Sequence, residues 1–81
     1  MQGISPITPQ DAFGQVLRRH RLKTGWSQEQ LGLESGVQRN FISLIETGQN
    51  QPTITTLFKL AAALNAPPSM LIAEAEQIIS S

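Results

Sequence analysis

The chain has 81 residues, 40% of them apolar, with no cysteine and with six Lys and Arg against six Asp and Glu, so its formal net charge is zero. This size fits one small domain without disulfides, no apolar run reaches the about 18 residues of a membrane-spanning helix, and we expect no signal peptide. The absence of cysteine fits a reducing compartment, and the zero net charge on its face speaks against a nucleic-acid partner.

The first predicted helix follows a short arm. Residues 1–8 hold Gly and Pro without periodicity, which predicts a flexible N-terminal arm. Thr8 and Pro9 form a helix start, with a hydroxyl cap followed by proline at the first helical position. Gly25 is a typical helix stop, so we expect a helix over 9–24.

Four more short helices are predicted, and no strands. Ser27 and Gln30 are typical of a capping box, in which each residue satisfies the other's backbone amide. Thr53 caps a later helix whose apolar stripe begins at Ile54. The predicted helices are 27–35, 38–46, 54–64 and 68–79, followed by a tail at 80–81. The predicted fold class is therefore all-α, with five helices in one domain over 9–79.

The second and third predicted helices are too close in the sequence for antiparallel packing. Only Ser35-Gly36-Val37 separates them, so they must cross steeply. Gly32 supplies a small residue for a close crossing, and Gly36 the unusual backbone angle of the turn. The small core expected between these helices comprises Leu31, Val37, Ile42 and Ile45.

One face of the third predicted helix is polar. At about 100° per residue, Arg39, Asn40, Ser43 and Thr47 share roughly one quadrant, and Leu44 borders it. A short helix that presents Arg and Asn in this way suits the major groove of DNA, where Arg pairs with guanine and Asn with adenine. On amphipathicity alone, the simpler interpretation of this quadrant is ordinary solvated surface.

The charged residues are unevenly placed along the chain. Residues 18–39 hold five basic and two acidic residues, a net charge of +3, whereas the rest holds Lys59 against four acids, a net charge of −3. The neutral total therefore hides a basic middle, which by itself is also typical of a solvated helix face.

These features resemble the Xre/Cro family of lambda-repressor-like helix-turn-helix proteins. The resemblance runs from residue 13 to residue 71 and is carried, in order, by LRRHRLKTGWSQEQL, Gly36-Val37, FISLIETG, Pro52-Thr53 and TLFKLAAALN. It implies a prokaryotic, cytoplasmic, nucleoid-associated transcriptional regulator or repressor, with its helix-turn-helix at the second and third helices. Such a regulator binds double-stranded DNA as a homodimer on a pseudo-palindromic operator, with the third helix in the major groove.

The resemblance also implies roles for individual residues. Those implied to read bases are Gln38, Arg39, Asn40, Ser43 and Leu44. Those implied to contact phosphates are Gln28, Thr47, Gln49 and Gln51. Arg21 and Glu46 match a structural salt bridge, which would make the charge of Arg21 unavailable to DNA.

The chain departs from the family pattern at three places. Gln38 replaces the usual Ser or Thr cap of the third helix, a loss of about 1 kcal/mol. His20 stands where an apolar residue is usual and has no partner nearby in the sequence, so we interpret it as a half-buried packing residue. The loop 49–51 lacks Lys and Arg, which predicts weaker binding to the DNA phosphates there.

The last predicted helix carries more apolar residues than one short terminal helix can bury alone. Part of this surface is therefore predicted to be a symmetric dimer interface. The predicted interface residues are Met70, Leu71, Ile72, Ile78 and Ile79. Chains of this kind resemble both restriction–modification controllers and small phage or plasmid repressors.

Two other classes of function stay open. An antitoxin or adaptor-type protein-interaction module with weak DNA affinity fits the zero net charge, although Arg39 and Asn40 on one face disfavour it. An enzyme has little support, because the chain holds one His, no Cys and no Gly-rich phosphate loop. We likewise expect no cofactor and, for want of ligands, no metal site.

Overall fold

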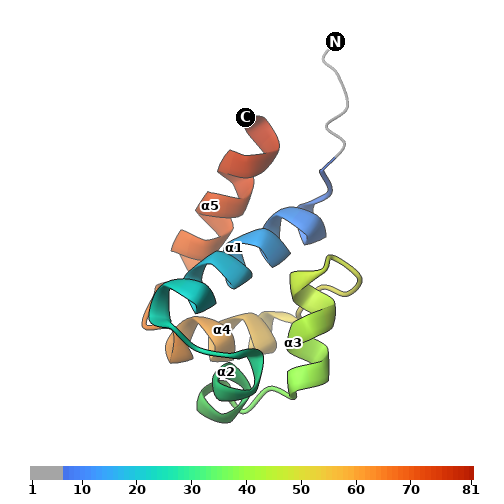
Figure 1. Ribbon diagram of the computed structural model, residues 1–81. Helices are drawn as coiled ribbons and strands as arrows, with labels where there is room; N and C mark the ends of the chain where they lie inside the picture. The colour runs from blue at the N-terminus through green and yellow to red at the C-terminus, as the bar shows by residue number, and fades with distance from the viewer. Residues whose placement is uncertain (1–6) are drawn as a thin grey trace.

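The computed structural model describes residues 7–81, which form five α-helices around one core (Figure 1). The helices are α1 (Pro9–Thr24), α2 (Gln28–Ser35), α3 (Arg39–Glu46), α4 (Ile54–Ala63) and α5 (Pro68–Ser80). α1 crosses the middle of the molecule between α5 and α3, α2 packs against α3 and α4, and α4 packs against α5. No strand occurs in this part of the chain, and the all-α fold class is confirmed.

The predicted helix boundaries agree with the structure to within one residue. The predicted starts at 27 and 38 are the caps of α2 and α3, just outside the helices themselves. The predicted arm over 1–8 lies largely outside the described residues. Its last two residues belong to the folded domain, because Ile7 packs against the core and the Thr8 hydroxyl caps α1.

The caps of α2 and α3 differ in quality. The Ser27 hydroxyl accepts a hydrogen bond from the backbone N–H of Gln30 at 3.0 Å. The Gln30 amide does not return to Ser27, since it donates instead to Glu34 at 3.1 Å, so the predicted capping box is only half formed. Gln38 makes no side-chain cap to α3, as its poor capping chemistry predicts.

The core lies between α1 and the other four helices. Its buried apolar residues are Ala12, Phe13, Val16, Leu17, Leu31, Val37, Ile42, Ile45, Leu57, Leu60, Ala61, Leu64, Leu71 and Ala75. The small core predicted between the second and third helices is therefore confirmed, as part of a larger one. Gly14 lets α1 approach the end of α3, because a Cβ there would collide with the carbonyl oxygen of Ile45.

Candidate nucleic-acid interface

α2 and α3 form a compact pair joined by a tight turn. Gly36 ends α2 with φ 77°, a left-handed conformation that glycine adopts without strain. At Gly32 a Cβ would lie 2.8 Å from the carbonyl oxygen of Val37, so α2 and the turn touch at backbone distance. This close contact sets the angle at which α3 leaves the turn, and thereby the direction of its outer face.

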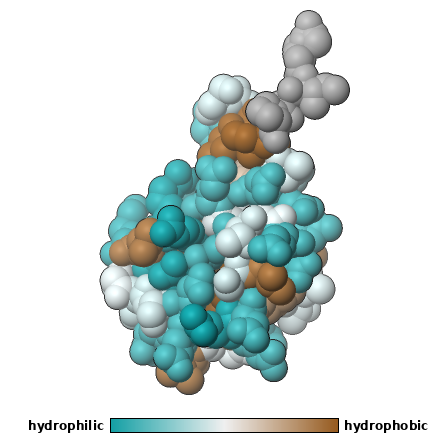
Figure 2. Space-filling view, turned by 45° about the vertical axis from the view of Figure 1, so that its right-hand side comes forward, coloured by the Kyte–Doolittle hydropathy of each residue, from teal (hydrophilic) through white to brown (hydrophobic). Residues whose placement is uncertain are grey.

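The residues predicted to read bases lie at one end and on one side of α3. Gln38, Arg39 and Asn40 are exposed, and Ser43 and Leu44 are half-buried one turn further along. The side chain of Arg39 makes no hydrogen bond or ion pair with any residue of the described chain, so its guanidinium is available. The surrounding face is mostly hydrophilic, with apolar residues in separate patches rather than one continuous surface (Figure 2). The arrangement presents one free guanidinium between the exposed amides of Gln38 and Asn40.

The end of α3 and the following loop are held by hydrogen bonds. The Thr47 hydroxyl donates to the carbonyl oxygen of Ser43 at 3.0 Å and accepts from the Gln49 amide at 2.9 Å. The backbone N–H of Gln49 donates to Leu44 at 2.9 Å, which folds the loop back onto the helix. Gln51 lies apart from these two residues, at the rim of an apolar hollow between α1, α4 and α5. The structure thus brings together two of the three loop residues predicted to contact phosphate.

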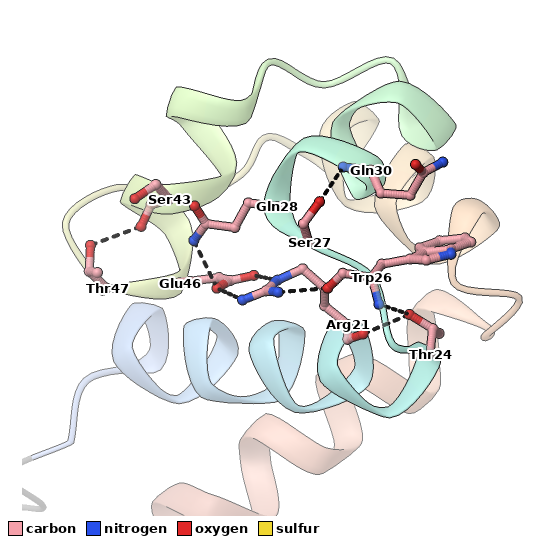
Figure 3. A network of polar contacts seen from close by, with 9 residues as sticks. All are labelled: Arg21, Thr24, Trp26, Ser27, Gln28, Gln30, Ser43, Glu46 and Thr47. Atoms are coloured by element: carbon pink, nitrogen blue, oxygen red, sulfur yellow. Dashed lines mark hydrogen bonds and ion pairs between the residues drawn. The ribbon is translucent and has the colours of Figure 1, made fainter.

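A buried ion pair joins α1 to α3, as the resemblance implies. Arg21 Nε and Nη2 donate to the two carboxylate oxygens of Glu46 at 2.7 and 2.9 Å (Figure 3). The two side chains are only 9% and 2% exposed, and the hydrogen bonds from Arg21 to Glu46 raise the pKa of Arg21 despite its burial. Arg21 Nη1 also donates to the carbonyl oxygen of Trp26, between α1 and α2, at 2.8 Å. The charge of Arg21 is therefore used inside the fold.

Gln28 joins this ion pair from the first turn of α2. Its amide Nε2 donates to Glu46 at 3.1 Å, and its amide oxygen points away from the carboxylate (Figure 3). Sequence reasoning assigned Gln28 to phosphate and Glu46 to Arg21, and missed the bond between the two. No spacing rule connects residues 18 positions apart on helices whose crossing angle is set by tertiary packing.

A second cluster joins α1 to α5. Glu74 accepts hydrogen bonds from Arg19 at 2.8 Å and from His20 at 3.0 Å. The bond from Arg19, with a smaller contribution from His20, lowers the pKa of Glu74 against the opposing effect of burial. His20 is half-buried as predicted, but it has a partner 54 residues away, which its local sequence could not reveal.

The two clusters reduce the charge that the basic middle can offer to a partner. Arg19 and Arg21 are paired with acids, so the net +3 of residues 18–39 is largely neutralised in the folded chain. Within residues 7–81, the Lys and Arg residues without a hydrogen-bond or ion-pair partner are Arg18, Lys23, Arg39 and Lys59. Of these, only Arg39 belongs to the α2–α3 pair.

The predicted dimer interface needs a correction. Leu71 is fully buried in its own domain, because it faces the core from α5 together with Ala75, so it cannot contribute to an outer surface. Ile78 and Ile79 are half-buried against the same core, whereas Met70 and Ile72 are 43% and 49% exposed.

The helix α4 adds to this outer apolar surface. Ile54 was expected in the apolar stripe that faces the core, but it is 71% exposed, because it opens α4 beyond the edge of the core. Phe58, one turn later, is 56% exposed. Ile54 and Ile72 both line the apolar hollow of about 540 Å³ between α1, α4 and α5. We call Ile54, Phe58 and Ile72 the α4–α5 apolar surface. Met70 lies about 200° around α5 from Ile72, on another side of the helix, and is not part of this surface.

None of the helices in the described part of the chain combines the length and the hydropathy that crossing a bilayer requires. No three His, Cys, Asp or Glu side chains within residues 7–81 come together in a way that could hold a metal ion.

Comparison with known proteins places the chain among DNA-binding regulators. Residues 17–71 match the family described as helix-turn-helix. The HTH-type transcriptional regulator SutR of Escherichia coli is 37% identical over 57 residues, which are 70% of this chain and 32% of SutR. The control protein C.BamHI of Bacillus amyloliquefaciens is 38% identical over 61 residues, 74% of this chain and 75% of C.BamHI. This chain thus spans about a third of the length of SutR and most of that of C.BamHI.

Solved structures show the same fold. The restriction-modification controller protein C.AhdI from Aeromonas hydrophila superposes with a TM-score of 0.75 and 39% identity, over 76% of this chain and 94% of C.AhdI. The controller C.Esp1396I, solved as a tetramer in complex with its natural 35 base-pair operator, superposes with a TM-score of 0.80. It is 25% identical, over 90% of this chain and 96% of C.Esp1396I.

Proposed function

Because the chain belongs to the Xre/Cro-like helix-turn-helix family of transcriptional regulators, we propose that it binds a pseudo-palindromic operator as a homodimer, with α3 in the major groove. The observation that carries this proposal is the pairing of exposed, unpartnered Arg39 with exposed Asn40 at the start of α3. Arg and Asn are the side chains that read guanine and adenine bidentately. Gln38, Ser43 and Leu44 complete the proposed base-reading surface, with Leu44 suited to a thymine methyl.

The proposed phosphate contacts flank α3 on two sides. Gln28 stands at the N-terminus of α2, where the backbone N–H groups of Gln28 and Glu29 have no acceptor in the described chain. Free amides and the helix dipole favour an anion at such a position. On the other flank, the Gln49 amide keeps one hydrogen free for a phosphate, whereas the Thr47 hydroxyl must release the Ser43 carbonyl before it can donate to one. Gln51 would reach a phosphate only if the loop rests on the DNA. Neutral contacts of this kind position a protein without releasing many counterions.

We assign the dimer contact to the α4–α5 apolar surface in place of the interface predicted from the sequence. Three large apolar side chains in contact with water on neighbouring helices favour burial against a second copy. For a pseudo-palindromic operator, the two-fold interface must present both copies of α3 to successive half-sites about 34 Å apart. Two of the relatives that the chain matches are restriction–modification controllers, which supports that role over a phage or plasmid repressor. Operator DNA as the ligand would place the protein at the nucleoid.

Selection of bound sequences from a random duplex library tests this function directly. We expect recovered sites with two inverted half-sites and a fixed spacing. Recovered sequences without symmetry would overturn the homodimer on a palindrome, and recovery of no enriched sequence would overturn operator binding itself.

An antitoxin or adaptor-type interaction module is the second candidate, and the low available charge favours it. Only one unpaired cation lies on the α2–α3 pair, and α2 carries the acids Glu29 and Glu34. A salt titration of binding to duplex DNA separates the two functions. A DNA-binding regulator gives a log–log slope of about −0.9 for each phosphate neutralised, whereas a module without a phosphate interface gives a flat response.

A further inference from the structure

We propose that Glu46 is a positioning residue for DNA binding, because its buried carboxylate holds the amide of Gln28 in the orientation that donates to a phosphate. The inference rests on the proposed function, in which Gln28 contacts the DNA backbone at the start of α2. It assigns a second task to a carboxylate that otherwise serves as the partner of Arg21.

The carboxylate of Glu46 has contacts from two helices and little contact with bulk water. Its side chain is 2% exposed, Oε2 accepts from Arg21 Nε at 2.7 Å, and Oε1 accepts from Arg21 Nη2 at 2.9 Å. Oε1 also accepts from Gln28 Nε2 at 3.1 Å. Since an ionised carboxylate can only accept hydrogen bonds, the Gln28 amide must turn its nitrogen toward Glu46. The orientation of this amide is therefore chemically determined (Figure 3).

The determined orientation leaves a donor for an anion. Nε2 of Gln28 carries two hydrogens, of which Glu46 takes one. The second hydrogen, with the free backbone N–H groups of Gln28 and Glu29, can donate to one phosphate oxygen on the nitrogen side of the amide. If the Gln28 amide turned over, its oxygen would take the place of Nε2. The amide oxygen and the phosphate oxygen, both acceptors, would then face each other.

Arg21 makes this arrangement compatible with a phosphate. A buried carboxylate without a cation would repel a phosphate that approached Gln28. The two hydrogen bonds from Arg21 neutralise Glu46, and the raised pKa of Arg21 keeps its guanidinium charged. Glu46 thus orients Gln28 without adding net negative charge to the DNA-binding surface.

Ordering Gln28 before DNA arrives also lowers the entropic cost of binding. A glutamine side chain that must be immobilised on binding reduces affinity by about 2- to 10-fold relative to one already held. We therefore expect loss of the Glu46 contact to weaken DNA binding by a factor in this range, confined to one phosphate in each half-site.

The experiment is a methylphosphonate scan of the selected operator with the full chain. Each phosphate in one half-site is replaced in turn by a neutral methylphosphonate, and affinity is measured for wild type, Gln28→Ala and Glu46→Gln. Glu46→Gln keeps the shape but offers a donor as well as an acceptor, so Gln28 can turn over. We expect one phosphate at which wild type is sensitive and both variants are not, with unchanged sensitivity at every other phosphate.

The matched control is Glu74→Gln, which breaks the other ion-pair cluster of α1 and should leave the whole phosphate profile unchanged. If Glu46→Gln does not fold, Glu46→Asp serves instead, because it keeps the charge for Arg21 but withdraws the oxygen from Gln28. Full wild-type sensitivity in the Glu46 variant, or an equal loss at all phosphates, would overturn the proposal.

Failure of the proposed function gives a different result. If wild type binds no operator, there is no phosphate profile to measure, and both the proposed function and this inference are overturned. If wild type binds but Gln28→Ala changes sensitivity at no phosphate, the positioning role is overturned while base reading by α3 stands.

Discussion

Gly14 on α1 lies against the carbonyl oxygen of Ile45 on α3 so closely that no Cβ fits between them. The contact places α1 directly behind the helix that we propose to lie in the major groove. A sequence pattern could not reveal it, because a glycine inside a helix by itself indicates only a loss of helix propensity.

Gly14→Ala should therefore destabilise the fold, although alanine is the better helix former by about 1 kcal/mol. Collision with backbone, which cannot rotate away as a side chain can, should cost more than this gain and leave a net loss of about 1–3 kcal/mol. Urea unfolding of the free protein measures this difference in the free energy of unfolding. Gln15→Ala, at the exposed next position, is the control and should be close to neutral. Equal or greater stability of Gly14→Ala would contradict the close packing.

Glu46→Ala should be strongly destabilising in the absence of DNA. The change leaves the guanidinium of Arg21 without its carboxylate in a site where both side chains are at least nine-tenths buried. Removal of one partner of a buried ion pair costs about 3–5 kcal/mol, since the other charge stays buried and unpaired. Thermal melting of the free protein checks this, and an unchanged melting temperature would show that the pair contributes nothing. The double variant Arg21→Met, Glu46→Leu should recover part of the loss.

Glu74 predicts a pH dependence of the contact between α1 and α5. Arg19 and His20 lower the folded pKa of Glu74 below its unfolded value. Its contribution to stability is therefore present above the unfolded pKa, about 4.3, and is lost as the pH falls through the folded pKa. Glu74→Gln should be less stable than wild type at pH 7, by less than about 1 kcal/mol because the pair is partly exposed.

The difference between the two proteins should disappear in acid. Urea unfolding of wild type and Glu74→Gln, measured from pH 7 down to pH 3, should give two stability curves that converge at the low end. Parallel curves over this range would mean that the ionised carboxylate contributes nothing to the contact.

Local patterns predicted the helices well, because caps, glycine stops and 3.6-residue periodicity act within one segment. The Arg21–Glu46 pair was implied by the family resemblance and is present in the structure. The predictions that were wrong depend on how each helix is rotated about its own axis relative to the core. Periodicity shows that a helix has an apolar side, but only packing decides that Leu71 faces the core and that Ile54 lies beyond its edge.

The partners of His20 and Gln28 were missed for the same reason. Their partners, Glu74 and Glu46, belong to helices distant in the sequence. A hydrogen bond of this kind depends on crossing angles set by the whole core, and the local sequence around either residue contains no signal for it. The joint exposure of Arg39 and Asn40 could be predicted from the sequence, because they are neighbours on one helix.

Ile72→Lys should prevent dimerisation without unfolding the domain. Ile72 is about half exposed, so a lysine there costs little in the monomer but places a desolvated charge in the proposed interface. Sedimentation equilibrium should show a dimer for wild type and a monomer for the variant. Leu33→Lys on α2 is the matched control, because Leu33 is exposed and apolar but lies outside the α4–α5 apolar surface. A monomeric wild type at tens of micromolar would contradict the interface.

Leu71→Ala should behave in the opposite way. Leu71 is fully buried, so its truncation leaves a cavity and should cost about 2–5 kcal/mol of stability in the monomer. A monomer–dimer equilibrium close to that of wild type, measured where the variant is folded, is expected. Weakened dimerisation without a loss of stability would return Leu71 to the interface predicted from the sequence.

Arg39→Ala tests the base-reading role most directly. Loss of a bidentate contact to one guanine should reduce affinity for the selected operator by about 1–3 kcal/mol and relax the preference at one base pair of each half-site. Folding should be unaffected, because Arg39 is exposed and bonded to no residue in the described part of the chain. Titration against the operator and against single-base variants of it gives both quantities.

Lys59→Ala is the matched control, since Lys59 is also an exposed and unpaired cation within residues 7–81 but lies on α4. It removes the same charge as Arg39→Ala, so any effect of net charge on DNA affinity is shared by the two variants. We expect Lys59→Ala to bind the operator as wild type does, with the same base preferences. Equal losses by Arg39→Ala on operator and random duplex DNA would instead make Arg39 a phosphate contact. Specificity would then fall to Asn40 and Gln38, the other exposed polar side chains at the start of α3.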